Sequence, residues 1–401
     1  MSLFWAEHQK LWRAGLTRLA TGLFLALLTA LQLWSYQSAN YGTMKADGSR
    51  YLDGPANIRE RQTYARQWEV LTDETLQQMV SALQTARAAN PEMDCERVTL
   101  YVLNDLLGSY WPELTDETQP YPSMLCWYAN PASLTGLYDR RDAALRTFLE
   151  NQFAAPADQA FFYRQDAQVE RPLRYGWSEG WANLLGNGIG GFGQLFLPPV
   201  LGLVLSPVFA GENRRGMRPV QLTTRRGAGA LARAKVGSAL AYTMELYGLY
   251  AGVLLLFQFG YLGIEGWDLP IQLIKSLATA PWAMWQGVVY EFAYVLCSSL
   301  GFAGITLLFS ALLGGTVPAL AAALLTTWLP QALAGYLPWA VRQYLNLLPF
   351  VGGAEDFFRT NLYHWFGLRI WSPWPLLAAP VLLGALCLPA AARRWRHIDL
   401  R

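Results

Sequence analysis

Six long apolar stretches divide the chain, and few charged side chains lie inside them. A helix needs about 20 mostly apolar residues to cross the hydrocarbon core of a bilayer, and these stretches have lengths of that order. The sequence therefore predicts an all-α polytopic membrane protein with six transmembrane helices. The spans are expected at residues 16–36, 181–210, 236–263, 287–313, 317–336 and 375–391.

The spacing of these stretches divides the chain into three predicted regions. They are residues 1–37, with an interfacial helix and the first span; residues 38–180, an extracytoplasmic domain; and residues 181–401, a domain of five transmembrane helices. In the first region, Phe4 and Leu11 are seven residues apart, as are Trp5 and Trp12, so each pair shares a helical face. A cleaved signal peptide is the alternative, but no A-x-A cleavage site follows, and we favour an uncleaved anchor.

The polar block between the first two spans is long enough to fold as a domain. A helix is expected at 72–90, where Thr72 can cap the first turn and four apolar residues share one face. These are Leu76, Met79, Val80 and Leu83. A second helix is expected at 139–153, and a loop at 104–131, which is rich in Pro, Tyr and Trp. The domain is therefore predicted to be mostly helical, and it could bind a ligand or shield the spans.

Charge is segregated along the chain, although the net charge is only +2. Acidic residues outnumber basic ones in the 38–180 block, whereas basic residues cluster near both termini and between the second and third spans. Positive residues beside spans are typical of the cytoplasmic side. We therefore expect a multi-pass protein of the cell membrane with both termini in the cytoplasm. Membrane lipid or a cytoplasmic protein is the expected partner, and nucleic acid is not.

The basic segment 211–235 carries a spaced pattern of its own. Glu212, Gly216, Leu222 and Lys235 follow the order E-x3-G-x5-L-x12-K, which resembles the membrane subunits of ABC-2 type ATP-binding-cassette transporters. The match differs from that family at two positions, Gln221 and Arg225. The tail, basic and aromatic and closing on Asp399, is also similar to the family.

This resemblance implies a specific function for the segment. It would be a coupling helix on which a separate ATPase subunit docks, with Glu212, Arg214, Arg215 and Arg218 as contact residues. ATP and Mg would belong to that ATPase, and the permease would pair with a second permease copy, as an exporter. The chain itself contains no G-x4-G-K-[ST], so we expect neither enzymatic activity nor a cofactor in it. Alternatively, the arginines only fix the topology and bind anionic lipid.

Acidic residues inside the spans are costly and are candidates for function. Glu245 lies ten residues into the third span, with Tyr242 and Tyr250 beside it, and Glu291 lies in the fourth. They could line a transport pathway or act in gating, and the alternative is that each is a structural carboxyl with a hydrogen-bonding partner.

Other reactive residues support weaker hypotheses. Cys95 and Cys126 both lie in the predicted external block, where a disulfide is permitted, and whether they are bridged stays open. The three histidines are far apart in the sequence, so no metal site is expected.

Gly176 to Gly180 fits the G-x-S-x-G of serine hydrolases, with Ser178 as nucleophile and His364 as base. A membrane hydrolase and a receptor that binds a ligand through 38–180 are therefore the alternative functions.

Overall fold

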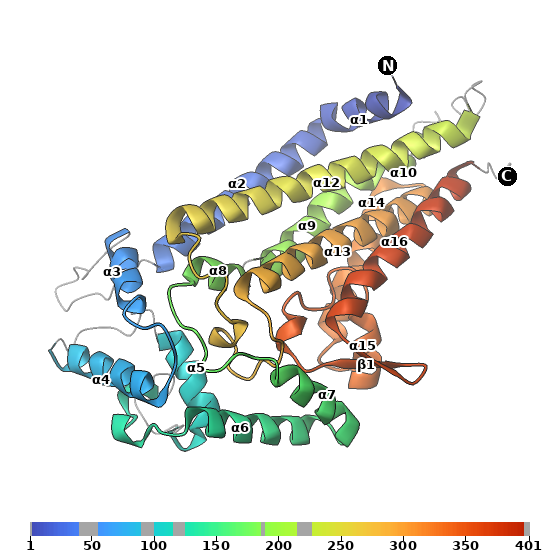
Figure 1. Cartoon of the computed structure of the whole chain (residues 1–401). Helices are drawn as coiled ribbons and strands as arrows, with labels where there is room; N and C mark the ends of the chain where they lie inside the picture. The colour runs from blue at the N-terminus through green and yellow to red at the C-terminus, as the bar shows by residue number, and fades with distance from the viewer. Residues whose placement is uncertain are drawn as a thin grey trace.

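The computed structural model describes residues 2–39, 55–89, 100–114, 125–185, 189–214 and 227–396. Long helices lie side by side in one half of the molecule, and a group of shorter helices covers one end of them (Figure 1). Both termini lie at the opposite end of the long helices (Figure 1). In the described part of the chain, the strands form a single two-stranded hairpin.

The six predicted spans are confirmed as helices long and apolar enough to cross a membrane. They are α2 (Gly15–Ala39), α9 (Ile189–Leu205) continued by α10 (Pro207–Arg214), α12 (Gly227–Leu262), α13 (Met284–Leu312), α14 (Thr316–Leu333) and α16 (Pro373–Arg396). The second span begins later than expected, because a separate short helix, α8 (Glu179–Asn183), precedes it.

Helix α13 lies at the centre of the long helices and is the most buried of the candidate spans. It packs against α9, α12, α14 and α16. Contact with α16 is close because small residues face each other: a Cβ atom at Gly304 would lie 2.7 Å from Cα of Gly384. Small residues let helix backbones approach in a membrane domain, so this contact fixes the last span against the centre.

The expected N-terminal helix is α1 (Leu3–Arg13), which leads into α2 through Ala14. One face of α1 packs on α12, where Phe4 contacts Gly237 and the ring of Trp12 meets Tyr242 edge to face. Trp5 lies on another face and is exposed. The amphipathic pattern therefore predicted the helix, and the structure adds the partner of its buried face.

The block before the second span is helical, as predicted. Its helices are α3 (Pro55–Ala65), α4 (Asp73–Ala89), α5 (Leu100–Tyr110), α6 (Leu137–Gln152) and α7 (Pro156–Asp166). Helices α4 and α6 confirm the expectations at 72–90 and 139–153, and the Thr72 hydroxyl accepts the Thr75 N–H at 3.2 Å. The expectation of a loop from residue 104 was wrong, because α5 extends to Tyr110. Leu103, Leu106 and Leu107 repeat at helical spacing there and are fully buried.

Two connections join this helical block to the long helices. The first is at the end of α12 and the segment that follows it: Nε1 of Trp177, just before α8, donates to the Leu262 carbonyl at 2.7 Å, and Nε1 of Trp181 in α8 donates to the Ile264 carbonyl at 3.0 Å. The second lies beyond α15 (Trp339–Leu345), in the hairpin of β1 (Leu362–Trp365) and β2 (Leu368–Trp371). There, Asp158 of α7 forms an ion pair with Arg369 at 2.6 Å and lies 3.1 Å from Nε2 of His364.

Candidate functional site

The ends of the predicted coupling segment meet in the structure. Helix α10 ends at Arg214 and α12 begins at Gly227, at the end of the molecule that carries both termini (Figure 1). Arg215, Gly216, Arg218 and Leu222 lie outside the described residues. The remaining two members of the spaced pattern, Glu212 and Lys235, are described, and they are in direct contact.

Glu212 and Lys235 belong to a cluster of four charged side chains, in which these two are buried, Glu7 is partly buried and Lys10 is exposed. Lys235 Nζ lies 2.6 Å from Glu212 Oε1 and 2.9 Å from Glu7 Oε2, and Lys10 Nζ lies 2.7 Å from Glu212 Oε1. Glu212 is 5% exposed and Lys235 only 2%. We call Glu7, Lys10, Glu212 and Lys235 the loop-base cluster, because it joins α10 to α12, the two helices on either side of segment 215–226.

Local packing positions the two buried members of this cluster. The span bends at Ser206, between α9 and α10, and the Ser310 hydroxyl of α13 bridges the break. That hydroxyl donates to the Ser206 carbonyl at 2.6 Å and accepts the N–H groups of Phe209 and Ala210 at 3.0 Å each. The start of α10 is thereby attached to α13 in the centre of the molecule, which holds Glu212 toward α12.

The position of Glu212 limits which partners its carboxylate can contact. Its carboxylate is directed to lysines of the same chain, and a direct contact with another protein would require the cluster to open. Removing either partner of a buried ion pair leaves a charge without compensation, so such clusters hold their elements together. Glu212 and Lys235 thus anchor the segment, and a docking role for side chains at 215–226 stays a prediction.

Glu245 of α12 has partners that lie outside the spans. His8 Nε2 lies 3.0 Å from Glu245 Oε1, and Trp12 Nε1 donates to Glu245 Oε2 at 2.7 Å. Tyr242, one turn earlier, shares a 2.9 Å hydrogen bond with the Thr21 hydroxyl of α2. Glu245 therefore helps to hold α1 on α12. His8 and Trp12 are four residues apart on the predicted amphipathic helix, but nothing in their spacing identifies α12 as its partner.

The other two candidate pathway residues lie at a different place. Glu291 of α13 is completely buried beside Gly190, near the start of α9, and the Tyr250 hydroxyl donates to the Ile189 carbonyl there. The four candidates therefore form two separate groups, one around α1 and one at the start of α9.

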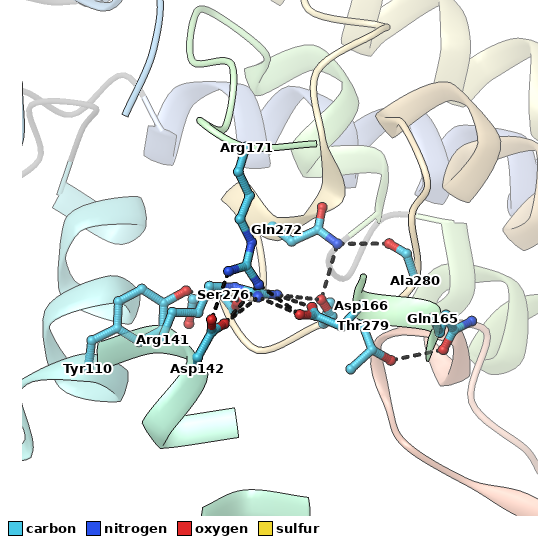
Figure 2. Close-up of polar contacts among 11 residues, drawn as sticks. Tyr110, Arg141, Asp142, Gln165, Asp166, Arg171, Gln272, Ser276, Thr279 and Ala280 are labelled. Atoms are coloured by element: carbon cyan, nitrogen blue, oxygen red, sulfur yellow. Dashed lines mark hydrogen bonds and ion pairs between the residues drawn. The ribbon is translucent and has the colours of Figure 1, made fainter. Parts of the chain in front are cut away.

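A third polar group, which the sequence did not indicate, lies in the helical block (Figure 2). Arg141 of α6 is 1% exposed. Its guanidinium donates two hydrogen bonds, of 2.6 and 3.0 Å, to the carboxylate of Asp166 in α7. The same guanidinium donates to the carbonyls of Ser276 and Ala278 at 3.2 and 3.3 Å. The Tyr110 hydroxyl also donates to the Ser276 carbonyl, at 2.9 Å.

This group clamps the connection between α12 and α13 onto the helical block. Burial raises the pKa of Tyr110, which keeps its hydroxyl protonated as a donor. Thr279 adds a 2.9 Å hydrogen bond to Gln165 of α7 (Figure 2). These bonds therefore link the helical block to the connection between α12 and α13.

The alternative sites gain no support from the geometry. Ser178 packs against Gly266, whereas His364 binds Asp158 on the hairpin, and no described contact joins the two. Residues 173–178 form no strand before α8, and a nucleophile elbow needs one.

Cys126 is buried, and Cys95 lies outside the described residues, so the disulfide stays untested. Among the described residues, no group of three or more His, Cys, Asp or Glu side chains could hold a metal ion.

No family model, curated protein or solved structure matches this chain. Its function must therefore be inferred from the chain itself. The relevant features are six apolar helices, a basic end that carries both termini, and a charge cluster with a buried Glu212–Lys235 pair that joins α10 to α12 at that end.

Proposed function

We propose that this chain is the membrane-spanning subunit of an ABC transporter of the ABC-2 type, driven by a separate ATPase that docks on segment 211–235. The observation that carries the proposal is the contact between Glu212 and Lys235. These two residues of the spaced pattern are 23 positions apart, yet they form a buried ion pair of 2.6 Å. Because this pair joins α10 to α12, a push on either end of the segment would reach both helices.

The cluster also determines which helices such a push would reach. Glu212 connects the segment to α10 and so to α9, Lys235 connects it to α12, and Glu7 and Lys10 connect it to α1. Movement of the segment would therefore be shared by three helical elements at once. Rigid movements of packed helices of this kind are a known form of conformational switching, and here they would re-pack the spans to release cargo outward.

The contact residues on this proposal are the arginines of the segment, Arg214, Arg215 and Arg218. Glu212 and Lys235 have the different role of holding its base. ATP and Mg would bind the partner ATPase, and a second permease copy would complete the transporter in the cell membrane. The helical block would lie outside the cell, with both termini in the cytoplasm.

The test is co-purification of the tagged full-length chain from mild detergent, with mass spectrometry to identify any ATPase that carries a P-loop. We expect such an ATPase with the parent protein and its loss with Arg215→Glu combined with Arg218→Glu. Arg393→Glu is the matched control, since it reverses a charge on α16, outside the segment, and should retain the ATPase. Absence of any ATPase across several detergents would contradict the proposal and favour the receptor alternative.

A further inference from the structure

A cavity of about 720 Å³ lies beside the loop-base cluster, between the α1–α2 pair and the α9–α10 pair, with α12 behind it. It is located where α2 begins and α9 ends, so it lies at one end of two candidate spans. In a bilayer crossed by these spans, a cavity at that level would face the region where lipid head groups meet the hydrocarbon core. Its volume lies in the range of pockets that hold small ligands, roughly 300–1,000 Å³.

The cavity is lined by two chemically different groups of residues. On its apolar side are Leu16, Leu203, Val204, Pro207 and Val208, and on its polar side are the loop-base cluster and Arg13. The apolar side comes from the spans, and the polar side comes from α1, α10 and the start of α12. This division matches an amphipathic ligand with its polar group toward the cluster and its chain toward the spans.

The charges on the polar side favour an anion. The two carboxylates and two lysines of the loop-base cluster offset one another, so Arg13 leaves one positive charge in excess among the lining residues. Arg13 is exposed, and its guanidinium can reach a ligand without breaking the cluster. Arginine binds phosphate oxygens through paired N–H groups, which suits a phosphodiester at this position.

One atom of the cluster requires a hydrogen-bond donor. Both lysines contact Glu212 Oε1, whereas Glu212 Oε2 is buried and accepts no hydrogen bond from any described residue. A buried acceptor without a partner is costly, and Glu212 lines the cavity, so a turn of its carboxylate that brings Oε2 to a donor on the ligand would be stabilising. A hydroxyl group meets this need better than a third ammonium group, because two ammonium groups already lie against the same carboxylate.

We propose that the cavity binds an anionic phospholipid whose head group carries a hydroxyl, of the phosphoglycerol type. The phosphodiester lies on Arg13, a head-group hydroxyl donates to Glu212 Oε2, and one acyl chain follows Leu16 and Val204. The lipid then contacts α1, α2, α9 and α10 together at the base of segment 211–235. This site needs no ATPase and is independent of the proposed transport function.

The test uses the full-length chain, delipidated in detergent, with four soluble probes and native mass spectrometry. Dioctanoyl phosphatidylglycerol is expected to bind about tenfold more tightly than dioctanoyl phosphatidylethanol, which has the same charge but no head-group hydroxyl. Dioctanoyl phosphatidylethanolamine, which carries no net charge, should also bind more weakly. Glycerol 3-phosphate, which has no acyl chain, should not compete. Equal binding of the first two lipids, or tight binding of glycerol 3-phosphate alone, would overturn the proposal.

Two pairs of variants locate the site. Arg13→Gln and Leu16→Trp should each weaken binding of phosphatidylglycerol by about tenfold, the first by removing the excess charge and the second by filling the apolar side. Arg393→Gln and Leu19→Trp are the matched controls: they make the same changes at exposed positions that do not line the cavity, and should bind as the parent does. Equal affinity in Arg13→Gln and Arg393→Gln would also overturn the assignment.

Discussion

Lys235 is the residue on which the loop-base cluster depends most, because it contacts both carboxylates and is almost inaccessible to solvent. Its ammonium group also lies 6.0 Å from the centre of the Trp395 ring, on α16. A buried charge that loses one of its partners is left uncompensated, so the cluster should respond to mutation as a unit.

Replacing Lys235 by Met should therefore destabilise the protein strongly, by about 3–5 kcal/mol, since the buried carboxylate of Glu212 and the partly buried one of Glu7 lose their common partner. Combining it with Glu212→Gln should cost much less than the sum of the two single changes. The measurement is thermal unfolding of the purified chain in detergent. Arg233→Met, an exposed basic residue two positions away, is the control and should change the midpoint little. Additive effects of the two single variants would contradict a coupled cluster.

Glu179 provides a pH-dependent prediction in the helical block. Burial raises the pKa of its carboxyl from 4.5 to about 7, against the attraction of Arg61, whose guanidinium lies 3.1 Å away. The unfolded chain releases this proton near pH 4.5 and the folded chain near pH 7, so between these values the folded state holds more protons. The free energy of unfolding should therefore fall as pH rises through this window, by at most about 1.4 kcal/mol per unit, and this group adds no slope above it.

The Glu179→Gln variant isolates this contribution. Its unfolding midpoint, measured from pH 4.5 to pH 8, should fall less steeply than that of the parent and should match the parent's slope above pH 7. Glu170→Gln removes an exposed carboxyl nearby and should follow the parent curve throughout. Parallel curves for Glu179→Gln and the parent would rule out the raised pKa.

At the scale of elements, the segment between α12 and α13 depends on side chains from the helical block. We predict that Arg141→Met frees this segment, because the carbonyls of Ser276 and Ala278 and the Asp166 carboxylate all lose a donor. Trypsin should then cleave after the exposed Lys275 at least about tenfold faster, since local opening becomes easier. Mass spectrometry of the fragments measures the rate. Arg146→Met, an exposed arginine on the same helix, should leave it unchanged.

The sequence predicts elements better than it predicts their partners. Apolar length identified the six spans, and the periodicity of Leu76, Met79, Val80 and Leu83 identified α4, because both signals are local. Contacts such as that between His8 and Glu245 join residues more than two hundred positions apart, and no spacing rule encodes them. Helix α5 was missed, and its residues from 104 onward were expected to be loop, because aromatic and proline residues further along outweighed a short leucine pattern. The buried Arg141 resembled any other charged residue of its helix.

At the scale of the whole molecule, the two ends of the long helices differ in chemistry. One end carries both termini, the basic residues Arg13, Arg233 and Arg393, the end of α10 and the start of α12. The other end carries the helical block, held by the Arg141 clamp and by Asp158 on the hairpin (Figures 1 and 2). The even number of candidate spans agrees with termini on one side. The sequence predicted this polarity from charge alone, and it did not predict the clamp.

This polarity predicts how the chain is oriented in the membrane. Basic residues beside spans are retained in the cytoplasm, so the terminal end should face inward and the helical block outward. In a variant with its four cysteines replaced, a membrane-impermeant maleimide should label Thr147→Cys in intact cells. Gln9→Cys and Arg393→Cys should react only after the membrane is permeabilised. All three positions are exposed in the folded chain, so accessibility depends on sidedness and not on burial. Labelling of Gln9→Cys and not Thr147→Cys in intact cells would reverse the orientation, and segment 211–235 would then be out of reach of a cytoplasmic ATPase.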